Sequence, residues 1–372
     1  MYDELKYLIA LMNIKGVGSS IARHLIEQLG SAKAVFETED HILRETGHIG
    51  ELIINGKADH ALFDKADSEI EFIVNHNIKA TIYKQEGYPK RLAECQDAPA
   101  LLFSLGNANL DSKHIVSIVG TRSSSHYGKD NVRNFIEGIK EALPDTVIVS
   151  GLALGIDISA HNASLEFGLP TVGVVAHGLD TIYPYNHRQI AKKMIDEGGS
   201  LITEYTSGTI PERGNFLARN RIIAGLADAV IVAESKDKGG SLVTASIALD
   251  YGRDVFAFPG RVNDLLSAGC NRLIRQNRAG LITCAQDFLE AMNWDRKAKS
   301  LNGVQHTIGF EEDDLSPTAR TIIDALRQRG DMRLNQIAIV TNIDQATLTE
   351  SLLMLEIEGK VRNVAGGLYQ LR

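Results

Sequence analysis

The chain has 372 residues, more than one hydrophobic core usually holds, so its length predicts two or three domains. Hydrophobic residues make up 44% and charged residues 23%, which excludes a fibre and a wholly disordered chain. The net charge of -8 argues against a protein that coats nucleic acid indiscriminately, although local basic patches remain open.

The cysteines and the amino-terminal segment indicate the compartment. Cys95, Cys270 and Cys284 lie far apart without paired spacing, which argues against a disulfide framework and a zinc site. The first apolar run follows acidic residues rather than the basic start of a signal peptide, and no window has the apolar length of a membrane span. We therefore expect a cytoplasmic protein with no metal, no cofactor and no membrane contact.

Residues 1–80 are predicted to form an all-helical domain, followed by a connecting segment over residues 81–110. The turn around Gly16 and Gly18 lies between two helical stretches and is similar to a helix-hairpin-helix (SAM-like) motif, whose amides can bind phosphate. A plain turn between helices has the same pattern. We favour the plain turn because a GxG spacing alone is weak evidence.

Residues 111–294 have a different sequence pattern, in which short apolar runs alternate with helix-length segments. This alternation predicts an α/β, extended Rossmann-like domain with a mostly parallel sheet. Ligands of such sheets gather at the carboxyl ends of the strands, and four successive loops there are rich in Gly, Ser, Thr and Arg. The six predicted strands are 115–119, 146–150, 171–175, 200–203, 229–233 and 255–258.

The segment from Asn215 to Thr244 joins an arginine-rich helix, a strand and a glycine turn. Gly240 follows another glycine, which permits close backbone approach, and Ser241 is expected to cap a helix that starts at Leu242. Free N–H groups at that helix start predict an anion site, and phosphate is the commonest anion at such places.

The remaining segments are basic, then acidic, then compact. Four arginines stand against one Asp264 between residues 261 and 278. Residues 295–315 are predicted to be a linker, and residues 316–372 a winged-helix domain. A small protein-interaction module fits the tail equally well, because its predicted recognition helix carries acids and no basic residue before Lys360.

Enzyme signatures are missing. The loops match neither GxGxxG nor the P-loop pattern, and Ser150 lacks the flanks of a nucleophile elbow. Asp157 is expected to cap the helix after it. His161, His177 and His187 have no metal-ligand spacing, so ordinary polar contacts are expected for them.

Seven motifs, in order over about residues 115–282, resemble the DNA processing protein A family (DprA, also called Smf). The resemblance implies a protein that binds single-stranded DNA without sequence preference, protects incoming strands and loads the recombinase RecA during natural transformation. The motifs are IVGTRSSSHYG, VSGLALGIDISAH, GLDTIYPYNH, LITEYTSGT, NFLARNRIIAGLADAVIVAES, GGSLVTASIALDYGRDVFAFPG and GCNRLIRQNRAGLI.

The resemblance also implies roles for individual residues. Arg122, with Gly120 and Thr121 of the same GTR motif, contacts the DNA backbone, and Phe216 stacks on a base. The other DNA-contacting positions implied are Arg213, Arg219, Asn220 and Arg221. Leu217 stands where the family usually has proline, and Leu154 where many members have arginine.

Physical chemistry supports this interpretation, because single strands are held by cations for phosphates and aromatic platforms for bases. For Arg122, in a Gly/Ser loop at a strand end, we favour binding. For Arg219 and Arg221 an equal alternative is structural pairing with Glu204, Asp228 or Glu234.

The resemblance further implies a homodimer through the end of the Rossmann-like domain, around Leu273, Ile274, Leu281 and Ile282. An ordinary core fits the same apolar alternation. The competing function is a nucleotide-processing, phosphoribohydrolase-like enzyme, but GGSLVTAS lacks the glutamate such enzymes place there. A dimeric scaffold with incidental DNA contact is a third alternative. We therefore expect a binding protein, not an enzyme.

Overall fold

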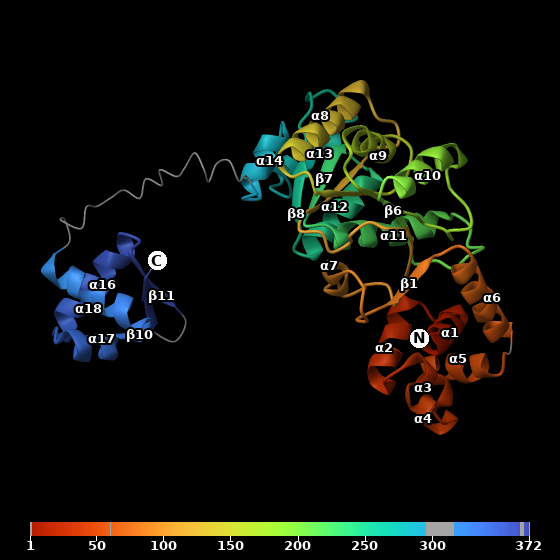
Figure 1. The fold of residues 1–372 in the computed structure, drawn as a ribbon, viewed down its shortest axis with the longest axis horizontal. Coiled ribbons are helices and arrows are strands. Elements are labelled where there is room, and N and C mark those ends of the chain that lie inside the picture. Colours follow the sequence, from red (N-terminus) through yellow and green to blue (C-terminus); the bar gives the residue numbers. More distant parts are fainter. Residues whose placement is uncertain (1, 60, 295–315, 365–367, 372) are drawn as a thin grey trace. The chain divides into compact units, whose positions relative to one another are not determined.

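The computed structural model describes residues 2–59, 61–294, 316–364 and 368–371, and the predicted linker 295–315 lies outside them. The chain divides into two compact units, Met1–Asp295 and Arg296–Arg372. Figure 1 shows the helices and strands of both units. No helix among the described residues is long and apolar enough to cross a membrane.

The first unit opens with helices packed around a core of their own. In α1, Leu5, Leu8 and Ile9 share one buried face, as the helical spacing predicts. The Glu69 carboxylate on α6 accepts hydrogen bonds from the Ser207 amide at 3.1 and 3.0 Å, which joins these helices to the sheet domain. The helices are α1 (Tyr2–Asn13), α2 (Ser19–Leu29), α3 (Ala32–Glu37), α4 (Asp40–Glu45), α5 (His48–Lys57) and α6 (Ala61–Asn75).

A nine-stranded sheet follows, in the order β1-β2-β6-β5-β4-β3-β7-β8-β9. The pairs from β6 to β9 are parallel, and β1 and β2 join antiparallel at the edge. The strands are β1 (Lys79–Ile82), β2 (Leu101–Gly106), β3 (Ile115–Gly120), β4 (Val147–Ser150), β5 (Thr171–Val174), β6 (Ser200–Thr203), β7 (Ala229–Glu234), β8 (Asp254–Ala257) and β9 (Gly280–Leu281).

The edge strands go beyond the six predicted ones. Residues 81–110, predicted as a connecting segment, supply β2 and the end of β1 to the main sheet. The reason is the apolar run Leu101–Leu102–Phe103, which is buried between helices and β6. The sheet is therefore mixed, with its parallel part in the middle.

Helices cover both faces of the sheet, because alternate residues of each strand point to opposite sides (Figure 1). Val116 and Ile118 pack on one side against α8, α9 and α14, whereas Ile115 and Val119 pack on the other against α7, α11, α12 and α13. These helices are α7 (Lys90–Ala93), α8 (His126–Ala142), α9 (Ile156–Phe167), α10 (Arg188–Asp196), α11 (Arg213–Leu226), α12 (Gly240–Asp250), α13 (Ala268–Arg275) and α14 (Ala285–Ala291).

The second unit has a separate small core. Helices α16 (Pro317–Arg329), α17 (Leu334–Thr341) and α18 (Gln345–Ile357) enclose Ile322, Leu348 and Leu352. An antiparallel sheet in the order β10-β12-β11 completes it, with β10 (Met332–Arg333), β11 (Val361–Val364) and β12 (Leu368–Leu371). The prediction of a winged helix stays a prediction.

Candidate nucleic-acid interface

A pocket of about 670 Å3 opens at the carboxyl edge of the parallel sheet. Loops after β3, β4, β5, β6 and β7 surround it, together with the start of α11. It brings together nine of the ten residues predicted to contact DNA or to bind phosphate: Gly120, Thr121, Arg122, Arg213, Phe216, Arg219, Asn220, Gly240 and Ser241. The sequence prediction that these loops converge is thus met by the geometry.

An arginine and an aromatic ring meet in the pocket. The Arg122 guanidinium carbon lies 5.1 Å from the centroid of the Phe216 ring, and the centroids of the Tyr183 and Phe216 rings are 5.8 Å apart. Arg122 is exposed, Tyr183 is 48% exposed and Phe216 is half-buried. The pocket therefore offers two aromatic surfaces beside a cation. Tyr183, from the loop after β5, had no predicted role, since only folding brings that loop here.

Arg219 forms the floor of the pocket. Its Nη1 donates to the Gly151 carbonyl at 2.6 Å and to the Val174 carbonyl, and only 3% of the residue is exposed. Burial lowers the pKa of Arg219 to about 10, partly offset by Asp157, so the side chain is still charged at neutral pH. Arg219 thus ties the loop after β4 to the end of β5. Its role here is structural, but its partners are backbone carbonyls rather than Glu204, Asp228 or Glu234.

Asp157 supports the same floor. Burial raises its pKa, whereas the Arg219 charge and hydrogen bonds including that from the Ala153 amide (3.4 Å) lower it. The expected capping role is wrong in detail. Helix α9 begins at Ile156 with Gly155 at its N-cap, and Asp157 lies in the first turn. Its carboxylate binds the preceding loop and balances Arg219.

Arg221 does not line the pocket, and its DNA contact stays a prediction. Its Nη1 and Nη2 each donate to the Glu204 carboxylate at 2.6 Å, and its Nε lies 3.7 Å from Asp97. Side chains two residues apart on a helix face different directions, so Arg219 and Arg221 cannot share one surface. This largely buried pair with Glu204 braces α11 against the loop after β6, as the structural alternative proposed.

The turn between β7 and α12 completes the rim of the pocket, that is, its exposed border. Helix α12 begins at Gly240 with Gly239 at its N-cap, two residues before the predicted start, and the Ser241 hydroxyl donates to the Ser235 hydroxyl at 2.9 Å instead of capping. Within the described residues the amides of Gly240 and Ser241 make no hydrogen bond. They line the pocket at a helix start, where amides attract anions.

Two lysines of this turn were not predicted as site residues. Lys236 and Lys238 line the pocket and are exposed. Asp237 between them pairs with Arg272 at 2.8 Å, so it does not neutralise them. No ion pair holds Lys236, Lys238, Arg122 or Arg213 in the part of the chain that the structure describes. Their position around a glycine turn at a strand end was the signal that could have identified them.

Buried contacts hold the loop that carries Arg122. The Glu234 carboxylate at the end of β7 accepts from the Ser125 amide at 2.8 Å and from the Ser125 hydroxyl at 2.5 Å. The Thr121 amide donates to the Glu234 carbonyl at 2.8 Å. A side chain at Gly120 would come within 2.4 Å of Ile156, so glycine is required there. Gly120 and Thr121 thus position Arg122.

Helix α11 begins at Arg213, so Arg213 and Phe216 both lie in its first turn. Leu217 follows them, where the resembled family usually has proline. A proline at this position would lose the amide donor and clash with the carbonyl four residues earlier, at Arg213. The leucine therefore permits the extra helical turn. The second departure, Leu154, is 51% exposed and does not line the pocket.

The predicted dimer residues divide into two kinds. Leu273 and Ile282 are 2% and 0% exposed and belong to the domain's own core, so their assignment to a dimer surface is wrong. Leu281 is 51% exposed and Ile274 is half-buried. The apolar pattern of the sequence could not tell the buried residues from the exposed ones, because within each segment only one of two neighbouring apolar residues packs into the core.

The histidines make polar contacts, as expected. His161 Nδ1 lies 2.7 Å from the Thr171 hydroxyl, and His187 Nδ1 lies 2.9 Å from the Leu152 carbonyl. The described residues contain no group of three His, Cys, Asp or Glu side chains placed to hold a metal ion.

Fold and pocket together define a Rossmann-like α/β protein with a cationic, aromatic pocket at the carboxyl edge of its sheet. Residues 79–293, more than half of the chain, match the family model of DNA recombination-mediator protein A. The chain belongs to this family, the DprA/Smf proteins.

Individual relatives agree with this assignment. Protein Smf of Synechocystis sp. is 31% identical over 412 aligned residues, covering 100% of this chain and 99% of that protein. DNA processing protein DprA of Streptococcus pneumoniae is 46% identical over 202 residues, covering 54% of this chain and 70% of that protein.

Two solved structures are also similar. The X-ray structure of DNA processing protein A from Streptococcus pneumoniae has a TM-score of 0.65 at 34% identity and covers 77% of this chain and 97% of that one. DNA processing protein A from Helicobacter pylori, studied for its single-stranded DNA binding mode, has a TM-score of 0.52 at 32% identity, covering 58% of this chain and 95% of that one.

Proposed function

We propose that this protein binds single-stranded DNA without sequence preference in the pocket at the carboxyl edge of its sheet. The observation that carries the proposal is the convergence of Arg122 and Phe216, 5.1 Å apart, with exposed cations around them. Phosphates would contact Arg122, Arg213 and the two lysines, whereas a base would stack on Phe216. Such contacts tolerate any sequence, because every base has a flat face. The Helicobacter pylori relative supports this ligand.

A fluorescence titration tests the proposal. Single-stranded and double-stranded oligonucleotides are compared at two salt concentrations, with the wild type and an Arg122→Ala, Phe216→Ala double variant. We expect the wild type to prefer single strands, its affinity to fall steeply with salt, and the double variant to lose binding. Arg44→Ala is the matched control, because it removes one exposed arginine charge from the amino-terminal helices. Salt-insensitive binding, or equal loss in the control, would reject the proposal.

We also propose that the bound strand is passed to RecA, so that the protein protects incoming DNA and acts in natural transformation and recombination. Membership of the DprA/Smf family supports this role. The test measures RecA filament formation on DNA precoated with single-strand binding protein. Acceleration by the wild type and none by the Arg122→Ala, Phe216→Ala variant is the expected result. Equal rates with and without the protein would contradict the role.

A homodimer through the exposed part of the predicted interface is proposed with it. Leu281 is 51% exposed at the edge strand β9, and Ile274 on α13 is half-buried. Leu281→Arg is expected to convert a dimer into a monomer in sedimentation velocity, without a change in the fold. A wild type that sediments as a monomer at every concentration would refute it.

The second unit is proposed to be a winged helix, since three helices precede a three-stranded antiparallel sheet. Its last helix carries Glu350 and Glu356 and exposes Leu353 and Met354, which favours protein over DNA contact. Deleting residues 316–372 should leave oligonucleotide affinity unchanged. A loss of more than about tenfold, or 1.4 kcal/mol, would assign DNA contact to this unit.

We propose a cytoplasmic binding protein rather than an enzyme. Asp157, the carboxylate of the pocket, is committed to Arg219 and the Ala153 amide, so it is not placed as a free base. Incubation with nucleoside monophosphates should release no free base. Release that disappears in Asp157→Asn would instead support the phosphoribohydrolase-like alternative.

A further inference from the structure

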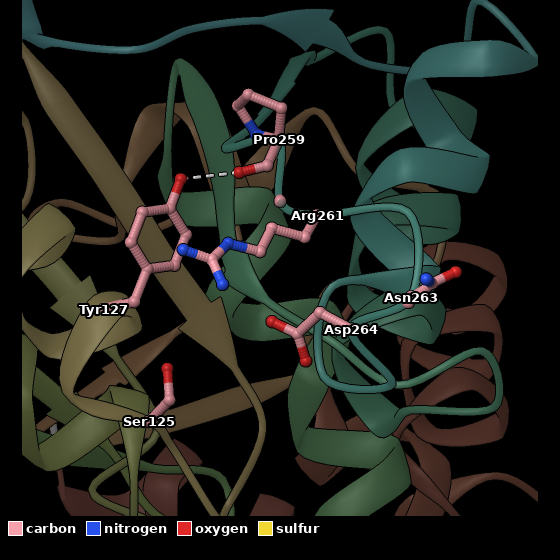
Figure 2. A pocket seen from close by; sticks show the side chains of 7 residues that line it. Ser125, Tyr127, Pro259, Arg261, Asn263 and Asp264 are labelled. Atoms are coloured by element: carbon pink, nitrogen blue, oxygen red, sulfur yellow. Dashed lines mark hydrogen bonds between the residues drawn. The ribbon is translucent and has the colours of Figure 1, made fainter.

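A second hollow, of about 870 Å3, lies beside the candidate interface at the same sheet edge. The start of α8 forms one wall, and residues 259–264 of the longer loop after β8 form the other. Figure 2 shows Tyr127, Arg261, Asn263 and Asp264 around this space. None of these four side chains belongs to the interface described above.

Tyr127 offers an anchored aromatic surface. Its hydroxyl donates to the Pro259 carbonyl at 2.6 Å, which ties the end of the ring to the opposite wall (Figure 2). The residue is still 46% exposed, and in the described chain no other ring packs against it. A ring that is fixed in position and open to solvent loses little entropy when a base stacks on it.

Arg261 supplies a cation without a carboxylate partner. It is exposed, and the described residues contain no ion pair to it. The nearest candidate in the lining, Asp264, is committed to its own turn: Oδ1 accepts from the Leu266 amide at 2.9 Å and Oδ2 from the Ser267 hydroxyl at 3.0 Å. The exposed Asn263 amide adds a neutral donor and acceptor.

The start of α8 is not the anion site of this hollow. The Glu234 carboxylate already accepts from the amide and hydroxyl of Ser125 at this helix end. A phosphate would therefore be repelled there and would bind on the opposite wall, at Arg261. This geometry places the base and the phosphate on different walls, as a nucleotide that spans the hollow requires.

The two pockets lie next to each other along the chain and in space. Ser125 in the second hollow is three residues from Arg122 in the first, a separation of at most about 11 Å. The Gly269 amide donates to the Ser235 carbonyl at 2.8 Å, which joins the helix after the 259–267 loop to the lysine-bearing turn. A short stretch of single-stranded DNA can occupy both.

We infer that the hollow between α8 and the loop after β8 is a second nucleotide subsite, in which one base stacks on Tyr127 and its phosphate contacts Arg261. This inference rests on the proposed single-strand binding and extends the path of the strand beyond Phe216. Val262 and Leu265, 94% and 79% exposed on the same loop, would serve a protein partner instead. Tyr127, Arg261 and continuity with the first pocket favour the nucleic acid.

Length-dependent binding tests the inference. Oligothymidines of about 4 to about 16 nucleotides, the range of single-strand site sizes, are titrated against the wild type, Tyr127→Ala and Arg261→Ala. A short oligomer fills only the Phe216 pocket, so both variants should bind it like the wild type. Long oligomers should bind Tyr127→Ala roughly 5- to 150-fold more weakly, the range expected for one lost stacking contact.

Matched variants separate the other outcomes. Tyr127→Phe keeps the ring but loses the hydrogen bond to Pro259, so it should bind long oligomers less tightly than the wild type and more tightly than Tyr127→Ala. Val262→Ser should bind long oligomers normally. Arg261→Ala changes only an exposed side chain, so it remains informative if Tyr127→Ala does not fold. Oligomers with 5-iodouracil should also crosslink to Tyr127 on illumination, as located by mass spectrometry.

Failure of the subsite and failure of the proposed function look different. The subsite alone would be overturned if Tyr127→Ala and Arg261→Ala kept the length dependence of the wild type while the Arg122→Ala, Phe216→Ala variant still lost binding. An equal loss in Val262→Ser would overturn it too and point to a protein-binding loop. A wild type that binds no oligomer of any length would remove both proposals.

Discussion

The floor and the rim of the candidate interface both contain arginines, but the arginine of the floor is buried and those of the rim are exposed. On the floor, Arg219 is 3% exposed and donates its hydrogen bonds to backbone carbonyls beside Asp157. On the rim, Arg122 and Arg213 are exposed and free of ion pairs among the described residues. A buried charge must be satisfied inside the protein, whereas an exposed one can exchange water for a phosphate.

This difference assigns stability to the floor and binding to the rim. Arg219 and Arg122 both lie within 6 Å of Phe216, at 5.8 and 5.1 Å from its ring centroid. Proximity to the aromatic platform therefore does not distinguish them. Burial and partners do, and variants that remove one side chain at a time test whether they separate stability from binding.

The largest expected effect is on the floor. Arg219→Met leaves the Asp157 carboxylate buried without its cation, so we expect unfolding free energy to fall by about 3–5 kcal/mol. Arg122→Met, the matched change on the rim, should alter stability by less than about 0.5 kcal/mol. The single tryptophan, Trp294, packs on Phe288 in the first unit, so its fluorescence in urea follows that unit. Equal losses in both variants would erase the distinction.

A second effect on the floor depends on pH. Burial, with smaller contributions from His187 and Arg219, lowers the pKa of His161 to about 3, below the ordinary value of 6.5. As pH falls, the His161 side chain therefore takes up a proton in the unfolded chain before it does so in the folded protein. The contribution of neutral His161 to the free energy of unfolding is present above about pH 6.5 and declines below it. Between neutral pH and about pH 5 the loss is about 2 kcal/mol for one such group.

His161→Gln tests this dependence, because glutamine does not titrate and can still bond to Thr171. We expect urea unfolding of the variant to vary less between neutral pH and pH 5 than that of the wild type. Part of the slope should persist, since burial also lowers the pKa of His177. An unchanged slope would show that His161 is accessible to protons in the folded state.

Much of the fold and part of the candidate interface could be predicted from the sequence. What could not be predicted has physical causes. Alternating apolar runs predicted the six inner strands and the shared edge of their loops, which placed Arg122 and Phe216 together. Arg221 pairs with Glu204 and does not join Arg219 in the pocket, because residues two apart on α11 face different ways. The burial of Ile282 and the approach of Tyr183 to Phe216 depend on contacts between distant segments, which no local pattern encodes.

On the rim, the next effect concerns stacking. Phe216→Ala should weaken oligonucleotide binding by about 1–3 kcal/mol, the value of one base stacked on one ring, without loss of stability comparable to Arg219→Met. Tyr185→Ala is the control, because Tyr185 is also aromatic, is 67% exposed and does not line the pocket. Titrations in which the two variants weaken binding alike would mean that Phe216 is not the platform.

The smallest effect concerns the two lysines that border the glycine turn. If Lys236 and Lys238 each neutralise one phosphate, the slope of log affinity against log salt should become shallower by about 0.7 for each lysine replaced by glutamine. The double variant Lys192→Gln, Lys193→Gln on α10 removes equal charge from exposed positions outside the pocket. Its slope should match the wild type, because the slope counts phosphate contacts rather than net charge. A parallel change in both double variants would therefore mean that the rim acts only through the overall field, and that the lysines do not contact the strand.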